Sequence, residues 1–258
     1  MSYREFFGSN ADQYSKSESH KYGNDLFLLV KKLEIMPEDV VIDLACGTGN
    51  TAVEVARSAR KVVCLDGTPE MLEKARFYAK NEKFLNMEFV LGNVENVPFE
   101  DNTFDIVTCR RAAHHFPDKM KFLENVSRIL KTGGKFGLVD MVPPEGFEDQ
   151  YNELERIRDH SHFFASGVKE WQGMAESNGL EIREIEIIED STTFTKWLYP
   201  VEESSENGKK CREFLTKSSE EFRKSIGYDG EKFLKRRMVL IGVKKNPARP
   251  KIKNLNDE

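Results

Sequence analysis

The stretch V40-V-I-D-L-A-C-G-T-G-N50 joins a run of β-branched and apolar residues to a glycine-rich turn. A helix-forming segment, NTAVEVARSA at 50–59, follows the turn directly. Glycines at such a turn let a ligand approach the backbone and the unpaired N–H groups at the start of the helix. The stretch therefore predicts the first strand–turn–helix unit of an α/β domain, with a ligand at the turn.

The rest of the chain repeats this alternation of short apolar runs and helical segments. Near-continuous apolar runs are typical of parallel strands that are buried on both faces. Five strands are predicted at 40–45, 61–66, 87–92, 104–109 and 135–141, and KTGG at 131–134 is read as a helix stop. Beyond Pro144 we expect helices near 148–159, 168–178 and 202–226 and strands near 181–189 and 237–244. The pattern predicts a Rossmann-like α/β fold.

Composition narrows the function. The 258 residues carry a formal net charge of −5 and a pI near 5.7, whereas a nucleic-acid binder is expected to be basic. The longest apolar runs fall far short of the roughly 20 residues that cross a bilayer. No secretory or transit signal is visible at the start, and the four cysteines form no CxxC pair. We expect a cytoplasmic protein with a small-molecule substrate and no nucleic-acid partner; contact with a membrane surface and the oligomeric state stay open.

The glycine turn alone fits two kinds of cofactor. Residues 47–52 also satisfy the G-x-G-x-x-G/A dinucleotide pattern, and Asp66, 23 residues beyond Asp43, suits the ribose hydroxyls of either nucleoside. Asp43 favours one of them, because a carboxylate at the end of the first strand would repel a pyrophosphate. S-adenosylmethionine (SAM) carries an ammonium and a sulfonium and no phosphate. The acid before the turn therefore favours SAM over NAD.

Several further motifs occur in order along the chain, and together they resemble the class I SAM-dependent methyltransferases. The similarity is greatest to the branch that contains the ubiquinone/menaquinone biosynthesis methyltransferases (methyltransferase type 11). The matching segments are Asp43 to Gly49; Asp66, Thr68, Met71 and Leu72; Gly92 to Phe99; Phe104 to Val107; Leu130 to Lys135; and Phe7, Ala11 and Tyr14 near the start.

The resemblance implies a seven-stranded, mostly parallel sheet with helices on both faces, an antiparallel last strand, an N-terminal helical lid and a helical cap. It implies SAM as cofactor and S-adenosylhomocysteine as product. The cofactor residues carried over are Tyr14, Asp43, Ala45, Gly47, Gly49, Asp66, Gly67, Met71, Asn93, Val94 and Arg110. Two of these residues depart from the family pattern. Asn93 stands in place of an aspartate but can still accept the hydrogen bond from the adenine amino group. Gly67 stands in place of an apolar residue, and Met71 could supply the lost contact with the adenine.

We expect one methyltransferase domain over 1–245. Within it, 1–33 would form the N-terminal lid, 34–142 the cofactor-binding core, 143–235 the substrate-cap helices with the sixth strand, and 236–245 the last strand. The tail, 246–258, contains two prolines and few apolar residues, and is expected to be disordered.

Four of the five histidines fall into two short clusters, His114 with His115 and His160 with His162. The first cluster follows the fourth strand, at the sheet edge where ligands of open α/β sheets bind. An imidazole that titrates near neutral pH suits a general base, so His115 is the first candidate and His114 the second. No H-x-x-x-H helical spacing supports a metal site, and we expect none.

Arginines near the same clusters predict an acceptor that is anionic or becomes an oxyanion. The substrate-binding candidates are Arg111, Asp140, Arg158 and His162. The predicted reaction is SAM-dependent methyl transfer to a small-molecule acceptor that is quinone-, phenol- or acid-like. An NAD-dependent oxidoreductase and a non-catalytic SAM-binding module remain as alternatives.

Overall fold

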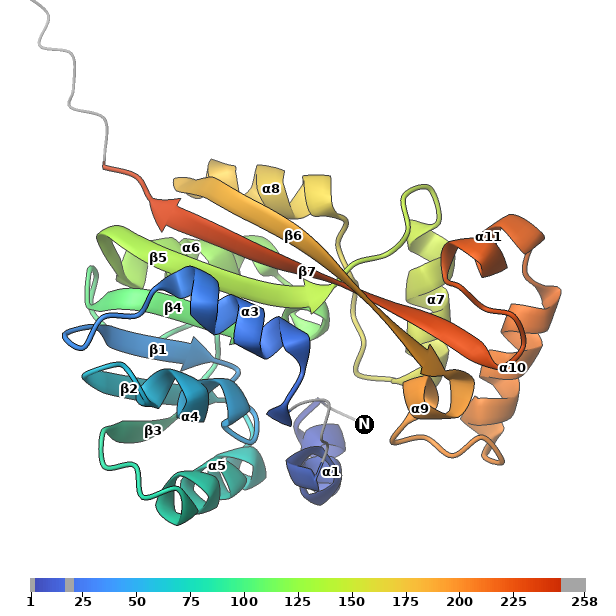
Figure 1. Cartoon of the computed structure of the whole chain (residues 1–258), viewed down its shortest axis with the longest axis horizontal. Helices are drawn as coiled ribbons and strands as arrows, with labels where there is room; N and C mark the ends of the chain where they lie inside the picture. Colours follow the sequence, from blue (N-terminus) through green and yellow to red (C-terminus); the bar gives the residue numbers. More distant parts are fainter. Residues whose placement is uncertain (1–2, 17–20, 247–258) are drawn as a thin grey trace, which may run out of the picture.

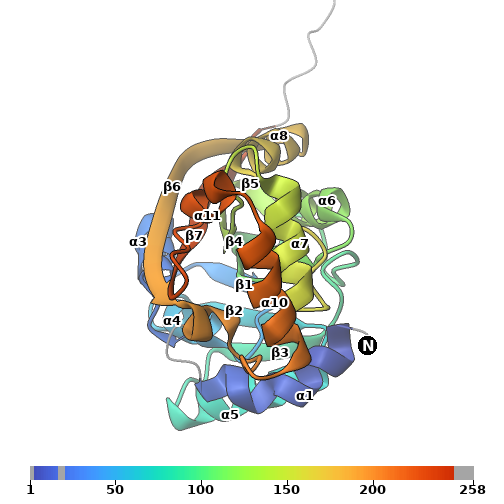
Figure 2. The same cartoon turned by 90° about the vertical axis from the view of Figure 1, so that its right-hand side faces the viewer.

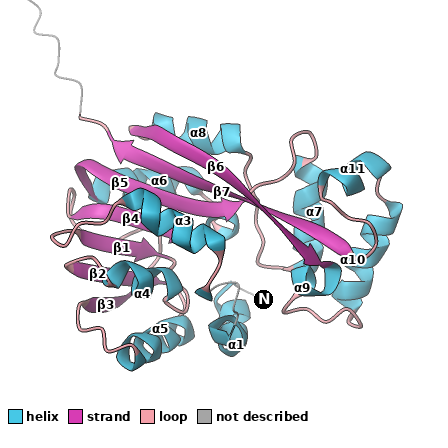
Figure 3. Cartoon of the chain, viewed as in Figure 1, coloured by secondary structure: helices cyan, strands magenta, loops and turns pink. Residues whose placement is uncertain are grey.

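A computed structural model of the chain describes residues 3–16 and 21–246. Its centre is a seven-stranded sheet in the order β3-β2-β1-β4-β5-β7-β6 (Figures 1 and 3). The strands are β1 (Val40–Leu44), β2 (Lys61–Asp66), β3 (Met87–Leu91), β4 (Phe104–Arg110), β5 (Leu130–Met141), β6 (Leu180–Thr193) and β7 (Lys232–Lys244). β1 to β5 pair in parallel, and β7 runs antiparallel to both of its neighbours. The predicted fold class is confirmed.

Helices cover both faces of the sheet. α3 (Asn24–Leu33), α4 (Asn50–Ala56) and α5 (Pro69–Asn81) bury their apolar sides in one core, which includes Leu29, Val55 and Leu72. α6 (Lys119–Ile129) and α8 (Val168–Ser177) share the core of the opposite face, with Phe122 and Trp171 fully buried. The sheet is therefore buried on both faces, as the apolar strand sequences predicted.

A third core lies beyond the sheet. The long strands β6 and β7 extend past β5 and carry a group of helices at their far end (Figure 1). This helical cap consists of α7 (Glu148–Arg158), α9 (Phe194–Leu198), α10 (Glu206–Lys217) and α11 (Glu220–Ser225). Leu154, Trp197, Leu215, Phe222 and Phe233 are buried between its elements. The cap thus has its own packing, joined to the sheet through the strand pair.

α1 (Tyr3–Lys16) lies against α5, near the cap (Figure 2). A Cβ atom on Gly8 would come within 3.2 Å of the Glu70 carboxylate, so the two helices approach closely there. Asp12 forms an ion pair with Lys74 of α5. On the other side, the Tyr199 hydroxyl donates to the carbonyl oxygen of Gln13 at 3.4 Å. α1 therefore connects the sheet domain and the cap.

The structure corrects two local expectations. β5 begins at Leu130, so it contains KTGG, and the β4–β5 register shifts between Phe104 and Ile106 to accommodate the extra residues. The predicted helix over 202–226 is two helices, because α10 ends at its C-cap Ser218 and the Ser219 side chain then caps the start of α11. The predicted disordered tail lies almost wholly outside the described residues. Within the described ranges, no helix is long and apolar enough to cross a membrane.

Candidate active site

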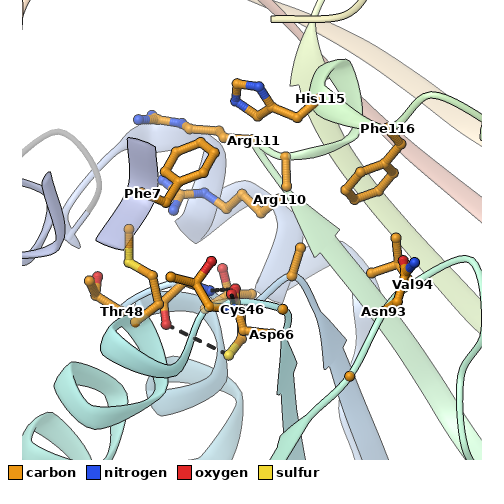
Figure 4. Close-up of a pocket in the computed structure, with 18 of the residues that line it drawn as sticks. Phe7, Cys46, Thr48, Asp66, Asn93, Val94, Arg110, Arg111, His115 and Phe116 are labelled. Carbon is orange, nitrogen blue, oxygen red and sulfur yellow. Dashed lines mark hydrogen bonds between the residues drawn. The ribbon is translucent and has the colours of Figure 1, made fainter. Parts of the chain in front are cut away.

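A cavity of about 370 Å³, called here the larger cavity, lies at the carboxyl ends of the parallel strands. Figure 4 shows Phe7 on one side of it and Asn93 and Val94 on the other. Its lining contains ten of the predicted site residues: Ala45, Gly47, Asp66, Gly67, Met71, Asn93, Val94, Arg110, Arg111 and His115. Ligands of open α/β sheets bind at this edge.

The glycine turn has backbone angles that explain its composition. Ala45, Gly47 and Gly49 all have positive φ, at 53°, 54° and 84°. A Cβ on Gly47 would meet no atom within 4 Å, so a side chain there would not clash. Glycine is instead favoured at this position by the positive φ, and its small size leaves room in the cavity. A Cβ on Gly49 would lie 3.0 Å from the Cβ of Ala75 on α5. Gly49 does not line the cavity; it lets α4 pack against α5.

We expect Gly49→Ala to destabilise the protein by about 2–4 kcal/mol, since a left-handed conformation costs about 1–2 kcal/mol and overpacking about 1–3. Urea unfolding followed by circular dichroism measures the change. Gly173→Ala in α8 is the matched control: its Cβ would meet open space at ordinary φ, so it should stabilise the fold by about 0.5–1 kcal/mol. Equal effects of the two substitutions would contradict the assigned role of Gly49.

Asp66 is held rigidly at the floor of the larger cavity. Its Oδ2 accepts from the Gly47 N–H and its Oδ1 from the Thr68 N–H, both at 2.8 Å. Burial raises the pKa of Asp66, while these backbone donors oppose the shift. Each carboxylate oxygen keeps a further lone pair. The arrangement suits a carboxylate that accepts hydrogen bonds from a ligand's hydroxyl groups.

Asp43 lies behind the cavity wall and is absent from its lining. It is 2% exposed, and its Oδ1 accepts from the Thr108 hydroxyl at 2.7 Å. Burial raises its pKa to about 7, against the hydrogen bond from Thr108 and the charge of Arg110. Asp43 therefore would not contact a cation bound in the larger cavity, and any effect on it would be electrostatic, at longer range.

The opposite wall carries the residues predicted to meet the adenine. Asn93 and Val94 line the cavity, as do Gly67 and Met71, and Met71 is 4% exposed. The Asn93 Oδ1 already accepts from the Glu95 N–H at 3.0 Å. An amide oxygen has two lone pairs, so one remains for a ligand.

Two arginines of the cavity share one carboxylate. Arg110 and Arg111 follow one another at the end of β4, and both donate to Asp25 of α3, with Nε–Oδ2 distances of 2.8 Å. Asp25 is fully buried. Burial opposes its ionisation, but the charges of Arg111 and Arg110 outweigh this and hold its pKa well below the usual range. The triad keeps one net positive charge at the cavity.

A smaller cavity of about 130 Å³ adjoins the larger one. Phe7, Arg111 and His115 line both, so the two spaces meet at these side chains. The ring of Phe7 packs edge-on against His115 at 4.9 Å. The smaller cavity is otherwise lined by His114, Asp140, Met141, Tyr151, Glu155, Arg158, Asp159, Trp197, Tyr199, Lys235, Arg236 and Arg237.

The two adjacent histidines have different partners. The His114 Nδ1 lies 2.5 Å from the Asp140 carboxylate. The His115 Nδ1 lies 2.9 Å from the carbonyl oxygen of Ser161, which can only accept, so Nδ1 carries the proton and Nε2 has the free lone pair. Burial, and then the neighbouring His114, lower the pKa of His115 to about 3. His115 is thus neutral at physiological pH, and the expectation that it titrates near neutrality is wrong.

The remaining candidates are placed as follows. Arg158 lines the smaller cavity, where it pairs with Glu155 at 2.7 Å and lies over the Trp197 ring. His162 lines neither cavity; its Nε2 is 2.7 Å from the Asn152 Oδ1, beside the ring of His114. The Tyr14 side chain lies outside the described part of the structure. Among the described residues, no group of three or more His, Cys, Asp or Glu side chains could hold a metal ion.

Sequence reasoning missed three kinds of residue here. The sequence did offer a sign that Asp25 is special, because this acid stands in the first turn of a helix, directly before the apolar run 26–30. Lys235 and Arg237 lie two apart in a run of three cations within a strand, so they share a face. Phe7 was seen only as part of a motif, and nothing in its position predicted that it would border two cavities.

Such a sheet, with adjoining cavities at its carboxyl edge, is the architecture of a class I methyltransferase. A family model described as a methyltransferase domain matches residues 35–196. The uncharacterised methyltransferase YcgJ of Bacillus subtilis is 37% identical over 201 residues, which cover 77% of this chain and 76% of YcgJ. The crystal structure of YcgJ superposes with a TM-score of 0.83 at 31% identity, covering 88% of this chain and all of that chain. A demethylmenaquinone methyltransferase of Lactococcus lactis is 32% identical over 146 residues, or 53% of this chain and 57% of that enzyme.

The chain therefore belongs to the methyltransferase domain family and is a methyltransferase. This supports the methyltransferase reading of the glycine turn over the dinucleotide alternative.

Proposed function

We propose that this protein binds SAM in the larger cavity and transfers its methyl group to a small-molecule acceptor in the smaller one. The observation that carries the proposal is the meeting of the two cavities at Phe7, Arg111 and His115. When bound, SAM supplies an electrophilic methyl group on its sulfonium. The four free, buried cysteines fit the reducing, cytoplasmic compartment predicted for the chain.

The residues of the larger cavity suit each part of SAM. The fixed carboxylate of Asp66 would accept from the ribose hydroxyls, and Asn93 from the adenine amino group. Arg110, held by Asp25, offers a positive charge for the methionine carboxylate. Val94 and Met71 give apolar contact where Gly67 provides none.

His115 is proposed as the general base. Its protonated Nδ1 is fixed by Ser161, so the lone pair of Nε2 is free to take a proton from an acceptor's O–H or N–H group. Burial and His114 disfavour the imidazolium that would form, and the negative charge of Asp159 offsets part of this effect. Most of the rate acceleration beyond that of the general base would come from orienting the acceptor and excluding water. His114, oriented by Asp140, is the second candidate.

SAM binding is tested by thermal unfolding with SAM, S-adenosylhomocysteine, NAD or NADH. A ligand at 100 times its Kd adds about 2.7 kcal/mol, so SAM and its product should raise Tm by several degrees and the nicotinamides should not. A shift with the nicotinamides alone would overturn the proposal. Stoichiometric SAM binding without turnover on a broad acceptor panel would favour a non-catalytic module.

Asp66→Asn should raise the Kd for SAM about tenfold or more, because an amide nitrogen replaces one charged acceptor. Isothermal titration calorimetry measures this. Asp101→Asn, an exposed aspartate remote from both cavities, is the control and should leave the Kd unchanged.

A further inference from the structure

The lining of the smaller cavity includes three cationic side chains of two elements: Arg158 of α7 and Lys235 and Arg237 of β7. We infer that this cation cluster binds an oxyanion group, a carboxylate or a phosphate, on the methyl acceptor. The inference rests on the proposed function, and it selects an acid among the quinone-, phenol- and acid-like acceptors. Lys235 is the residue assigned to specificity.

The ion pairs around the cluster leave positive charge in excess. Arg158 is paired with Glu155 at 2.7 Å, and Arg237 with Asp190 at 2.6 Å. Arg111, at the border of the cavity, shares its counter-ion, the carboxylate of Asp25, with Arg110. Lys235 forms no ion pair with any described carboxylate; its Nζ donates to the backbone carbonyl oxygen of Lys196 at 3.4 Å.

Lys235 is in an environment that disfavours its charge. Burial, and then the charges of Arg158, Arg237 and Arg111, lower its pKa to about 7, and the charge of Glu155 opposes the shift. A buried ammonium among guanidinium groups needs an anion to stabilise it. An oxyanion between Lys235 and the arginines would supply that charge and accept hydrogen bonds from them.

The smaller cavity also carries groups of the opposite chemistry. His114, His115, Asp140 and Asp159 line it, and His115 lines the larger cavity as well. An acceptor with its oxyanion against Lys235 would therefore present its far end to His115, where the cavities meet. Aromatic rings of Tyr151, Trp197 and Tyr199 line the same cavity. The cavity thus orients a molecule that is anionic at one end and nucleophilic at the other.

The test uses benzoate and inorganic phosphate as probes and benzamide as the neutral match of benzoate. Calorimetry on the full chain should show binding of one or both anions and none of benzamide. The preferred anion distinguishes a carboxylate from a phosphate acceptor. Lys235→Met should raise the anion's Kd about tenfold or more, as expected for a lost charge-assisted hydrogen bond. Lys232→Met, exposed on the same strand, should leave it unchanged.

The pH dependence gives a second readout. Anion binding needs the ammonium form, so affinity should be full below about pH 6 and fall as pH rises through about 7. NMR of lysine labelled at Nζ should show that a bound anion raises the pKa of Lys235. Lys235→Arg keeps its charge at all these pH values and should bind the anion without this dependence.

Equal anion affinity in wild type and Lys235→Met, benzamide binding as tightly as benzoate, or no binding of either anion would overturn the inference. None of these measurements needs SAM. An anion site with no thermal shift by SAM would instead contradict the proposed function, so the two failures are separable.

Discussion

Asp25→Asn is expected to lower the free energy of unfolding by about 3–5 kcal/mol. The substitution keeps the shape of the side chain but removes the one carboxylate that two guanidinium groups share, and Asp25 is fully buried. Removing one partner of a buried ion pair leaves uncompensated charge in a poorly solvated place. Urea unfolding at pH 7 measures the loss.

The matched control is Asp101→Asn. Asp101 also pairs with an arginine, Arg128 at 3.1 Å, but its side chain is 68% exposed. Exposed pairs contribute about 0–1 kcal/mol, so this variant should stay close to wild type. A loss below about 1 kcal/mol in Asp25→Asn would show that the arginines find other partners.

The free energy of unfolding at acid pH should also distinguish Asp25→Asn from the wild type. The folded pKa of Asp25 lies below its unfolded value of about 3.9, so its contribution is present above pH 4 and is lost as pH falls toward the folded pKa. Asp25→Asn lacks this group, so its stability should fall less steeply below pH 4. An unchanged acid slope would contradict the depressed pKa.

His115→Ala is expected to reduce kcat by about 10²–10⁴, the usual contribution of a general base, while the Kd for SAM changes little. Steady-state assays with an acceptor found by screening measure the rate. Because the pKa of His115 lies near 3, the base is unprotonated throughout the usual range. The wild-type kcat should therefore be flat from pH 5 to pH 8 and fall only as pH drops toward 3.

Added imidazole should restore part of the activity of His115→Ala, which a purely structural role would not explain. His160→Ala is the control, since His160 is exposed and bonds to Asn207 outside both cavities. A smaller loss in His115→Ala than in His114→Ala would assign the base to the His114–Asp140 pair. If His115→Ala and His114→Ala both kept the wild-type kcat, neither histidine would be a general base.

The strand–turn–helix unit shows what could be predicted locally. Positive φ at Gly47 and Gly49 and the buried alternation of strands follow from short-range sterics and hydrophobic period. Asp66 was predicted to face the ligand because parallel strands end at one edge of the sheet, and it does line the larger cavity. Such features are encoded within a few residues of where they act.

Asp43 and His162 show the limit of that reasoning. Both were predicted to meet a ligand, and both lie behind the cavity walls. Residue type and position along the chain bring a side chain to the right edge of the sheet, but they do not say how deep it lies. Depth depends on the helices that pack over it.

From sequence alone, the fold class, the order of the βα units and the sheet edge that carries the larger cavity could be determined, because apolar period and glycine turns act over short distances. Tertiary structure alone decided the partners and charge states. Asp25 meets Arg110 across 85 positions, and Lys235 meets Arg158 only because β7 runs back past α7. The pKa values of His115 and Lys235 follow from burial beside like charges, which arises only when distant elements pack together.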